Sequence, residues 1–186
     1  MEQLELVSRA RGGDHDAFAV LVDEALARLD AAARLIVRDT ELARDAVQDA
    51  MLKAWRQLPT LREPERFDAW LHRLAMRACI DAARRQRRHV VEVALTPLTD
   101  PWVADDTAAV HDRDLLDRVL GRLEPEQRAI LVLRYYLDLS LPDAADALGI
   151  PLGTAKSRLH RSLAAVRSSV AATQSMPAVR PEGRLA

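Results

Sequence analysis

Apolar residues recur every three or four positions along most of this 186-residue chain, which is the spacing of one face of an α-helix. The pattern covers residues 14–88, with short breaks at 39–40 and 58–64, and it resumes over residues 111–170. Six glycines and few aromatic residues, beside abundant alanine, leucine and arginine, favour helices over strands. The pattern predicts an all-α protein.

Two segments lack this periodicity. Residues 89–111 contain Pro97, Pro101 and several acids, and they cannot bury an apolar face, so they are predicted to form an acidic, flexible linker. Residues 171–186 are predicted to be a disordered tail. We therefore expect two small helical domains, residues 1–88 and residues 112–170.

Charge is sorted along the chain, although the formal net charge is only −1. Residues 72–89 contain six arginines and one acid, whereas residues 92–114 contain six acids and one arginine. A near-neutral protein gains little from counterion release and should bind DNA weakly by itself. A helix with so many arginines nevertheless repels itself unless an anionic partner exists, so we expect such a partner.

The helix that carries these arginines is predicted to be amphipathic. Within about 60° of Arg73 around the helix lie four more arginines: Arg77, Arg84, Arg87 and Arg88. Trp70 lies at the border of this arc, where an indole could stack on an unpaired base. A place at the rim of the core is the alternative for a lone tryptophan. We favour a platform for single-stranded nucleic acid.

The strongest local signal lies at residues 140–149. Ser140 can cap the first amides of a short helix, Asp143 can return a bond, and Gly149 can end the helix in the left-handed conformation. A second helix follows, with one apolar face and a polar face free of acids through Arg167. The pair predicts a helix-turn-helix whose second helix reads DNA. The alternative is a helical hairpin with a solvated basic face.

Two further helices are predicted beside these. Residues 123–136 are apolar nearly all round and should form a central core helix, in which Tyr135 and Tyr136 are core rather than site residues. Residues 41–58 should bury a row of small apolar side chains and leave Leu52 exposed among polar groups. An exposed leucine there suggests a protein interface, although single exposed leucines are common.

Other classes of function have little support. The lone cysteine, Cys79, excludes an internal disulfide and a cysteine-rich zinc site, and the five histidines lack metal-ligand spacing. The chain has no glycine-rich phosphate loop, so we expect no cofactor and no enzyme activity. No apolar run is long enough to cross a bilayer, and the first residues are not a leader, so we expect no membrane insertion and a cytoplasmic location.

Three segments together resemble the extracytoplasmic-function (ECF) group of sigma-70-family RNA polymerase sigma factors. Residues 43–55 are similar to the family's polymerase-clamp helix, and residues 67–88 to its melting and minus-ten-reading helix. Residues 123–128, 139–140 and 148–161 are similar to its minus-thirty-five-binding domain. The resemblance implies a two-domain transcription initiation factor that binds core RNA polymerase and promoter DNA.

The resemblance also implies roles for particular residues. The clamp of the polymerase β′ subunit would be contacted by Asp45, Gln48, Asp49 and Leu52. Promoter DNA would be contacted by Trp70, Arg73, Arg77, Arg84, Arg85, Arg88, Thr154, Lys156, Ser157, Arg158 and Arg161. The loop at residues 58–66 would capture a flipped minus-ten base, the second domain would meet the β flap, and an anti-sigma factor is the expected inhibitor.

The chain departs from the usual sequence of the family at three positions. Arg77 replaces the usual asparagine, and Ala144 and Met51 replace larger apolar residues, which implies a repacked core. A free-standing helix-turn-helix regulator is the alternative function, and it would require a dimer with half-site symmetry.

Overall fold

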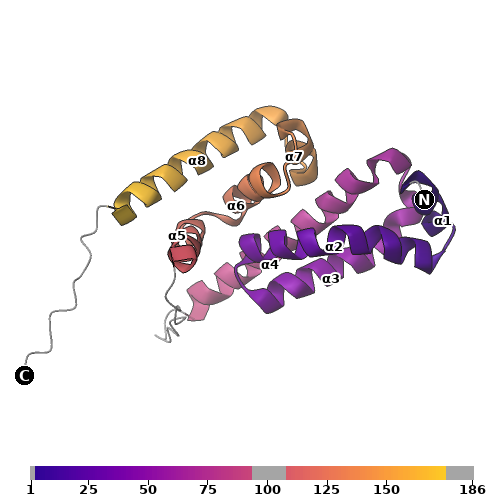
Figure 1. Ribbon diagram of the computed structural model, residues 1–186, viewed down its shortest axis with the longest axis horizontal. Helices are drawn as coiled ribbons and strands as arrows, with labels where there is room; N and C mark the ends of the chain where they lie inside the picture. The colour runs from indigo at the N-terminus through magenta and orange to yellow at the C-terminus, as the bar shows by residue number, and fades with distance from the viewer. Residues whose placement is uncertain (1–2, 94–107, 175–186) are drawn as a thin grey trace, which may run out of the picture.

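The computed structural model describes residues 3–93 and 108–174, and every regular element in these two ranges is helical (Figure 1). The first range contains α1 (Gln3–Arg11), α2 (His15–Val37), α3 (Thr40–Gln57), two short 3-10 turns (Leu58–Thr60 and Pro64–Arg66) and α4 (Phe67–Val93). The second contains α5 (Ala108–Gly121), α6 (Pro125–Leu131), a π-helical turn (Val132–Tyr136), α7 (Leu141–Leu148) and α8 (Leu152–Gln174). The all-α prediction is confirmed.

Aspartates begin two helices of the first bundle. The Asp14 carboxylate accepts bonds from the amides of Asp16 and Ala17, both at 3.0 Å, and starts α2. The Asp39 carboxylate accepts from the Leu42 amide at 2.9 Å and starts α3. These side chains satisfy amide groups that have no partner within the helix. The helices α2, α3 and α4 then pack around a shared apolar core, with α1 against α2.

The second bundle contains the predicted helix-turn-helix. Ser140 caps α7 by accepting from the Asp143 amide at 3.3 Å, and Gly149 ends the helix with a φ of 64°. The Asp143 carboxylate accepts from the Ser140 hydroxyl rather than from its amide, so the predicted return bond takes a different form. Ala144 and Ala145 are buried, and α8 follows after Pro151. The sequence therefore predicted both helices and the turn correctly.

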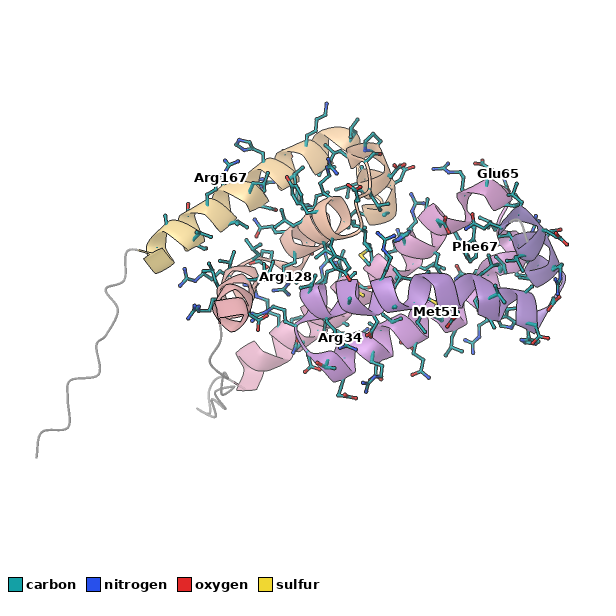
Figure 2. The ribbon with its side chains drawn as sticks, viewed as in Figure 1. Arg34, Met51, Glu65, Phe67, Arg128 and Arg167 are labelled. Carbon is teal, nitrogen blue, oxygen red and sulfur yellow. The ribbon has the colours of Figure 1, made fainter. Side chains whose placement is uncertain are left out.

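The two bundles pack directly against one another. The α7 helix lies on α4, and α6 contacts both α4 and α2 (Figure 1). Arg128 joins the bundles from a buried position on α6 (Figure 2). Its guanidinium donates to the carbonyls of Ile36 at 2.6 Å, Leu123 at 3.0 Å and Leu120 at 3.3 Å. Burial lowers the pKa of Arg128 to about 10, helped by the charges of Arg38 and Arg87, so the side chain stays charged at neutral pH.

Two expectations about the core need correction. Tyr135 and Tyr136 are 61% and 43% exposed, not buried. Leu133, within the π-helical turn, and Leu137, which follows it, are buried in their place. In addition, residues 3–11 form a helix that the sequence analysis did not predict. This helix buries Leu6, Val7 and Ala10, a spacing that could have revealed it.

The expected boundaries also shift. The α4 helix continues to Val93, since residues 89–93 contain no proline or glycine to stop it, so the first five residues of the predicted linker are helical. At the other end, α5 begins at Ala108 and α8 extends to Gln174, beyond the expected start of the tail. The rest of the predicted linker, residues 94–107, and of the tail, residues 175–186, lie outside the described residues.

Candidate nucleic-acid interface

The α4 helix has the two faces that its sequence predicts. Its buried face contributes Phe67, Leu71, Ala75, Met76, Ala78, Cys79 and Ala82 to the core. The five arginines of the predicted site on this helix are all exposed: Arg73, Arg77, Arg84, Arg85 and Arg88. Packing of the first face holds the second in place, so Arg73, Arg77, Arg84 and Arg88 form a row along the helix, and Arg85 lies to one side of it.

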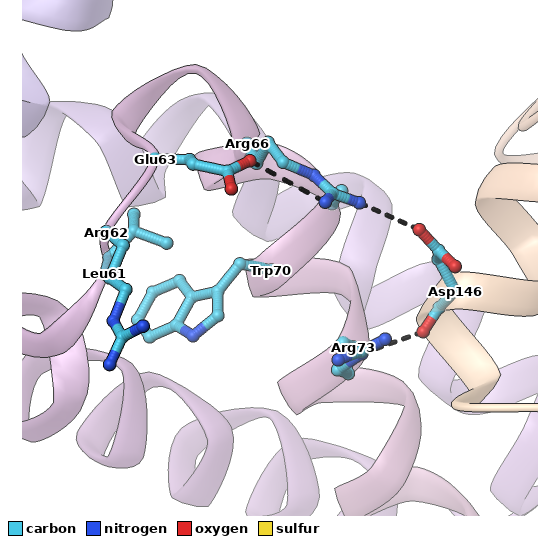
Figure 3. Close-up of a pocket in the computed structure, with 8 residues that line it drawn as sticks. Leu61, Arg62, Glu63, Arg66, Trp70, Arg73 and Asp146 are labelled. Atoms are coloured by element: carbon cyan, nitrogen blue, oxygen red, sulfur yellow. Dashed lines mark hydrogen bonds and ion pairs between the residues drawn. The ribbon is translucent and has the colours of Figure 1, made fainter.

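The structure places Trp70 at the rim of the core, and its role in base stacking stays a prediction. The indole is half-buried and lies 6.0 Å, centroid to centroid, from the Phe67 ring, as a residue at the rim of the core would. It also lines a cavity of about 370 Å³ (Figure 3). The walls of this cavity are Leu61, Arg62, Glu63, Arg66, Ala69, Trp70, Arg73 and Asp146. An aromatic ring beside arginines suits a stacked base and its phosphate.

One wall of this cavity comes from the second bundle. The Asp146 carboxylate, on α7, pairs with Arg66 at 2.8 Å, and the Asp146 carbonyl accepts from Arg73 Nε at 2.8 Å (Figure 3). Sequence reasoning did not identify Asp146, whereas Arg66 belongs to the loop at residues 58–66 that the resemblance had indicated. Their 80-residue separation in the chain leaves no local signal of the contact.

A second set of contacts lies further along α4. Arg84 pairs with Glu126, and Arg87 pairs with Glu124, both acids standing at the start of α6. Arg158 and Arg161 of α8 line a cavity of about 270 Å³ with the same two acids and Arg84. The structure therefore brings arginines of both predicted DNA-binding helices to one pair of carboxylates.

The remaining predicted residues of α8 lie along its first turns. Lys156, Ser157 and Arg161 are exposed, and Thr154 is half-buried. The Ser157 hydroxyl donates to the Thr154 carbonyl at 3.0 Å, and Arg161 Nε donates to the Ser157 carbonyl at 3.3 Å. No acidic residue occurs on this helix. These side chains form a basic surface suited to phosphate contacts.

The predicted polymerase-contact residues form a separate surface on α3. Asp45, Gln48 and Asp49 are exposed, and Leu52 is 50% exposed. Beside them lies a groove of about 580 Å³ between α2 and α3, to which Leu26 and Met51 contribute apolar surface. An exposed leucine next to an apolar groove has the character of a protein-binding surface.

The other chemistry of the described residues is limited. Burial raises the pKa of the Cys79 thiol to about 12, which makes this cysteine a poor nucleophile. Within residues 3–93 and 108–174, no cluster of three His, Cys, Asp or Glu side chains could hold a metal ion. No helix in these ranges is long and apolar enough to span a membrane.

The chain is similar in sequence to a known protein family. Residues 21–89 match the sigma-70 region 2 family, and residues 113–166 match the sigma-70 region 4 family. The chain is 40% identical over 161 residues to the ECF RNA polymerase sigma factor SigM of Mycobacterium tuberculosis, covering 86% of this chain and 80% of SigM. This chain belongs to the ECF sigma factors. A more distant member, SigW of Bacillus subtilis, is 26% identical over 176 residues, covering 88% of this chain and 94% of SigW.

Two solved structures have a fold similar to that of this chain. CnrH, in complex with the cytosolic domain of CnrY, superposes with a TM-score of 0.68 at 27% identity, covering 91% of this chain and 97% of CnrH. RpoE of Bartonella quintana, in complex with the anti-sigma factor NepR, shares the fold with a TM-score of 0.67 at 23% identity, covering 83% and 96%. The ECF sigma factor described here binds core RNA polymerase and promoter DNA and directs transcription initiation. It is neither an enzyme nor a free-standing regulator.

Proposed function

We propose that this sigma factor recognises its promoter through two surfaces. The minus-ten element would be melted and held by Trp70, the α4 arginines and the loop at residues 58–66. The minus-thirty-five element would be contacted by the basic face of α8. The observation that supports this assignment best is the cavity beside Trp70, where an indole, Arg66 and Arg73 meet. Stacking and charge together suit an unpaired nucleotide.

The two domains would then have different roles in initiation. Residues 1–88 would bind core polymerase and open the minus-ten region, and residues 112–170 would bind the upstream duplex and the β flap. On α3, Asp45, Gln48, Asp49 and Leu52 would contact the β′ clamp. Arg77 would hold a phosphate, because a guanidinium donates charged hydrogen bonds that the family's asparagine cannot.

Two further proposals concern an inhibitor of the protein and its location in the cell. The structure of CnrH is in complex with the cytosolic domain of CnrY, and that of RpoE is in complex with an anti-sigma factor. We propose that an anti-sigma factor inhibits this protein as well, and that it acts in the cytoplasm, where promoter DNA and RNA polymerase are found. Purification of the tagged protein from its host would recover such an inhibitor, and purification without one under non-inducing conditions would count against it.

Reconstituted transcription tests the DNA-binding proposal. Core RNA polymerase and this protein are added to fragments of the host genome, and the transcript starts are mapped. Discrete starts that share two upstream elements are expected. On such a promoter, Trp70→Ala should reduce initiation roughly 10-fold or more, because base stacking on an aromatic ring contributes about 1–3 kcal/mol. Trp70→Phe should retain most of the activity, because it keeps a ring.

Matched arginines on α8 test the upstream contact. Arg161 and Arg167 are both exposed, but only Arg161 lies on the proposed DNA surface. Arg161→Ala should weaken promoter binding by holoenzyme and lower its salt dependence by about one phosphate contact. Arg167→Ala serves as the control and should behave as the parent protein. Equal effects of the two substitutions would exclude the proposed orientation of α8.

A further inference from the structure

We propose that α1 positions the loop at residues 58–66 and thereby sets how strictly this sigma factor selects the base held beside Trp70. The inference rests on the proposed function, because it assumes that this loop captures a flipped minus-ten base. None of the described residues of α1, Gln3–Arg11, lines the cavity beside Trp70. The effect of α1 on the base must therefore pass through the loop, which makes its side chains positioning residues.

The loop has few hydrogen bonds of its own that fix its shape. The Leu61 amide donates to the Leu58 carbonyl, and the Arg66 amide donates to the Glu63 carbonyl, both at 3.0 Å. Each of these bonds closes a single 3-10 turn, in which the hydrogen-bond geometry is poorer than in an α-helix. Neither bond fixes one turn relative to the other. The shape of the loop therefore depends on what the two turns pack against.

The α1 helix packs against both turns of the loop. It contacts the turn at Leu58–Thr60 and the turn at Pro64–Arg66, besides its longer contact with α2. Val7 of α1 and Leu58 of the loop are both fully buried and belong to the same apolar core. Contact of one helix with both turns fixes the turns relative to each other.

The residues between the two turns line the cavity. Leu61, Arg62 and Glu63 lie outside helical structure and form one wall, and Trp70 is another lining residue (Figure 3). Arg62 can donate hydrogen bonds to the edge of a base, and Glu63 can accept them. Because only three residues join the turns, a shift of either turn would move this wall relative to the indole. The distance between the wall and the indole decides which base fits.

A hydrogen bond also joins α1 to the start of α4. Gln3 Nε2 donates to Asp68 Oδ1 at 2.7 Å, across 65 positions of the chain. Asp68 lies in the first turn of α4, which also carries Trp70. Through this bond, α1 is tied to the helix that carries the indole as well as to the loop beside it. The α1 helix therefore links the two walls that would enclose the base.

Exchange of the two polar groups tests this bond. Gln3→Glu keeps the length of the side chain but replaces the donor with a carboxylate, which repels Asp68. Asp68→Asn alone keeps an oxygen that can accept from Gln3. The double variant Gln3→Glu/Asp68→Asn restores a hydrogen bond, because the new amide can donate to the new carboxylate. Both positions are exposed, so all three variants should fold.

A matched pair of buried valines tests the packing. Val7→Ala loosens α1, whereas Val37→Ala removes the same atoms from the last residue of α2. The two side chains are 0% and 1% exposed, so the variants should lose similar stability. Hydrogen exchange of residues 58–66 is measured by mass spectrometry on the full chain. Exchange there should be roughly five-fold faster in Val7→Ala than in Val37→Ala, because local packing controls local opening.

Base selectivity in transcription is the decisive readout. Holoenzyme with each variant initiates from promoters that carry each base at every minus-ten position, and the ratio of initiation between the best base and the next is measured. This ratio does not depend on the fraction of protein that is folded. Gln3→Glu and Val7→Ala should lower it roughly five-fold at one position, since small displacements of positioning groups are costly. Gln3→Glu/Asp68→Asn and Val37→Ala should keep the parent ratio.

Unchanged ratios for Gln3→Glu and Val7→Ala would overturn the inference, and so would an equal loss of selectivity in Val37→Ala. Direct variants of the cavity separate this result from failure of the proposed function. If Arg62→Ala and Trp70→Ala change the base preference at one position while the α1 variants do not, only the role of α1 is wrong. If Arg62→Ala and Trp70→Ala leave every base preference unchanged, the loop does not capture the base, and the proposed function fails together with the inference.

Discussion

The α3 and α4 helices are neighbours in one bundle, and each buries one face and exposes the other. They differ because α4 also packs against helices of the second domain. The outer face of α3 carries Asp45, Asp49 and Leu52 in solvent. The outer face of α4 carries arginines that are held by Asp146, Glu126 and other groups of the second domain. If these two faces bind polymerase and DNA as proposed, the polymerase face carries no ion pair to the described residues of the second domain, whereas several exposed arginines of the DNA face bond to it.

Charge balance explains why the two helices differ. The α3 helix carries as many acids as bases, and Arg44 pairs with Glu41 on the same helix at 2.9 Å. The exposed face of α4 has almost only arginines, of which Arg84 has a nearby acid on its own helix, Asp81, at 3.8 Å. The α4 face therefore needs counter-charges from elsewhere, and the acids at α6 and α7 supply them.

The largest effect should come from the buried part of the contact between the bundles. Arg128→Met keeps the apolar stem but leaves three buried carbonyls, those of Ile36, Leu120 and Leu123, without their donor. We expect a loss of about 3 kcal/mol in the free energy of unfolding, because buried unsatisfied polar groups are costly. Urea unfolding measures the change. Arg122→Met, at an exposed position, is the control and should lie within about 0.5 kcal/mol of the parent protein.

The open face of α3 should show the next largest effect. Asp45→Arg/Asp49→Arg should weaken binding to core polymerase roughly 30-fold, since like-charge contacts at an interface cost several kcal/mol. The same substitutions should leave the radius of gyration unchanged, because neither residue contacts the second domain. Leu52→Ala can be compared with Leu116→Ala, two leucines of nearly equal exposure at 50% and 49%. Equal polymerase affinity for both leucine variants would argue against the α3 surface.

Cys79, on the buried face of α4, should make the stability of the protein depend on pH. The pKa of Cys79 is raised from 9.0 to about 12 by burial, so folding favours the neutral thiol. Its contribution is complete below pH 9 and is lost as the pH rises from 9 toward 12, because the unfolded chain ionises first. Between pH 8 and pH 10 the parent protein should lose about 1 kcal/mol more stability than Cys79→Ala. Urea unfolding at the two values tests this, and parallel losses would contradict it.

The smallest effect concerns a site that the sequence pattern placed in the core. Tyr135→Ser should change the free energy of unfolding by less than about 0.5 kcal/mol, because the ring is exposed. Leu133→Ser, two residues earlier at a fully buried position, should cost several times more. A large drop in the melting temperature of Tyr135→Ser would support the prediction that Tyr135 is a core residue.

Local pattern was sufficient for most elements of this protein, although it did not predict α1 and placed the ends of α4, α5 and α8 a few residues away. The short α7 helix, its Ser140 cap and its Gly149 end follow from side-chain chemistry within ten residues, as does the division of α4 into an arginine face and an apolar face. The chain also contains enough family-specific sequence to indicate a sigma factor, and the two family matches confirmed it. The prediction that Tyr135 and Tyr136 belong to the core was wrong, because a segment that is apolar nearly all round does not show which of its side chains face solvent.

Tertiary structure alone decided which surfaces are covered. The partners Arg66 and Asp146 are 80 residues apart, and Arg128 and Ile36 are 92 apart. Nothing in the neighbourhood of either residue encodes such a pair, because it depends on how two separately folded faces meet. The sequence by itself determined the helices and the charges that they carry. Packing of α6 and α7 on α4 decided that the arginines predicted to hold DNA are occupied within the protein itself.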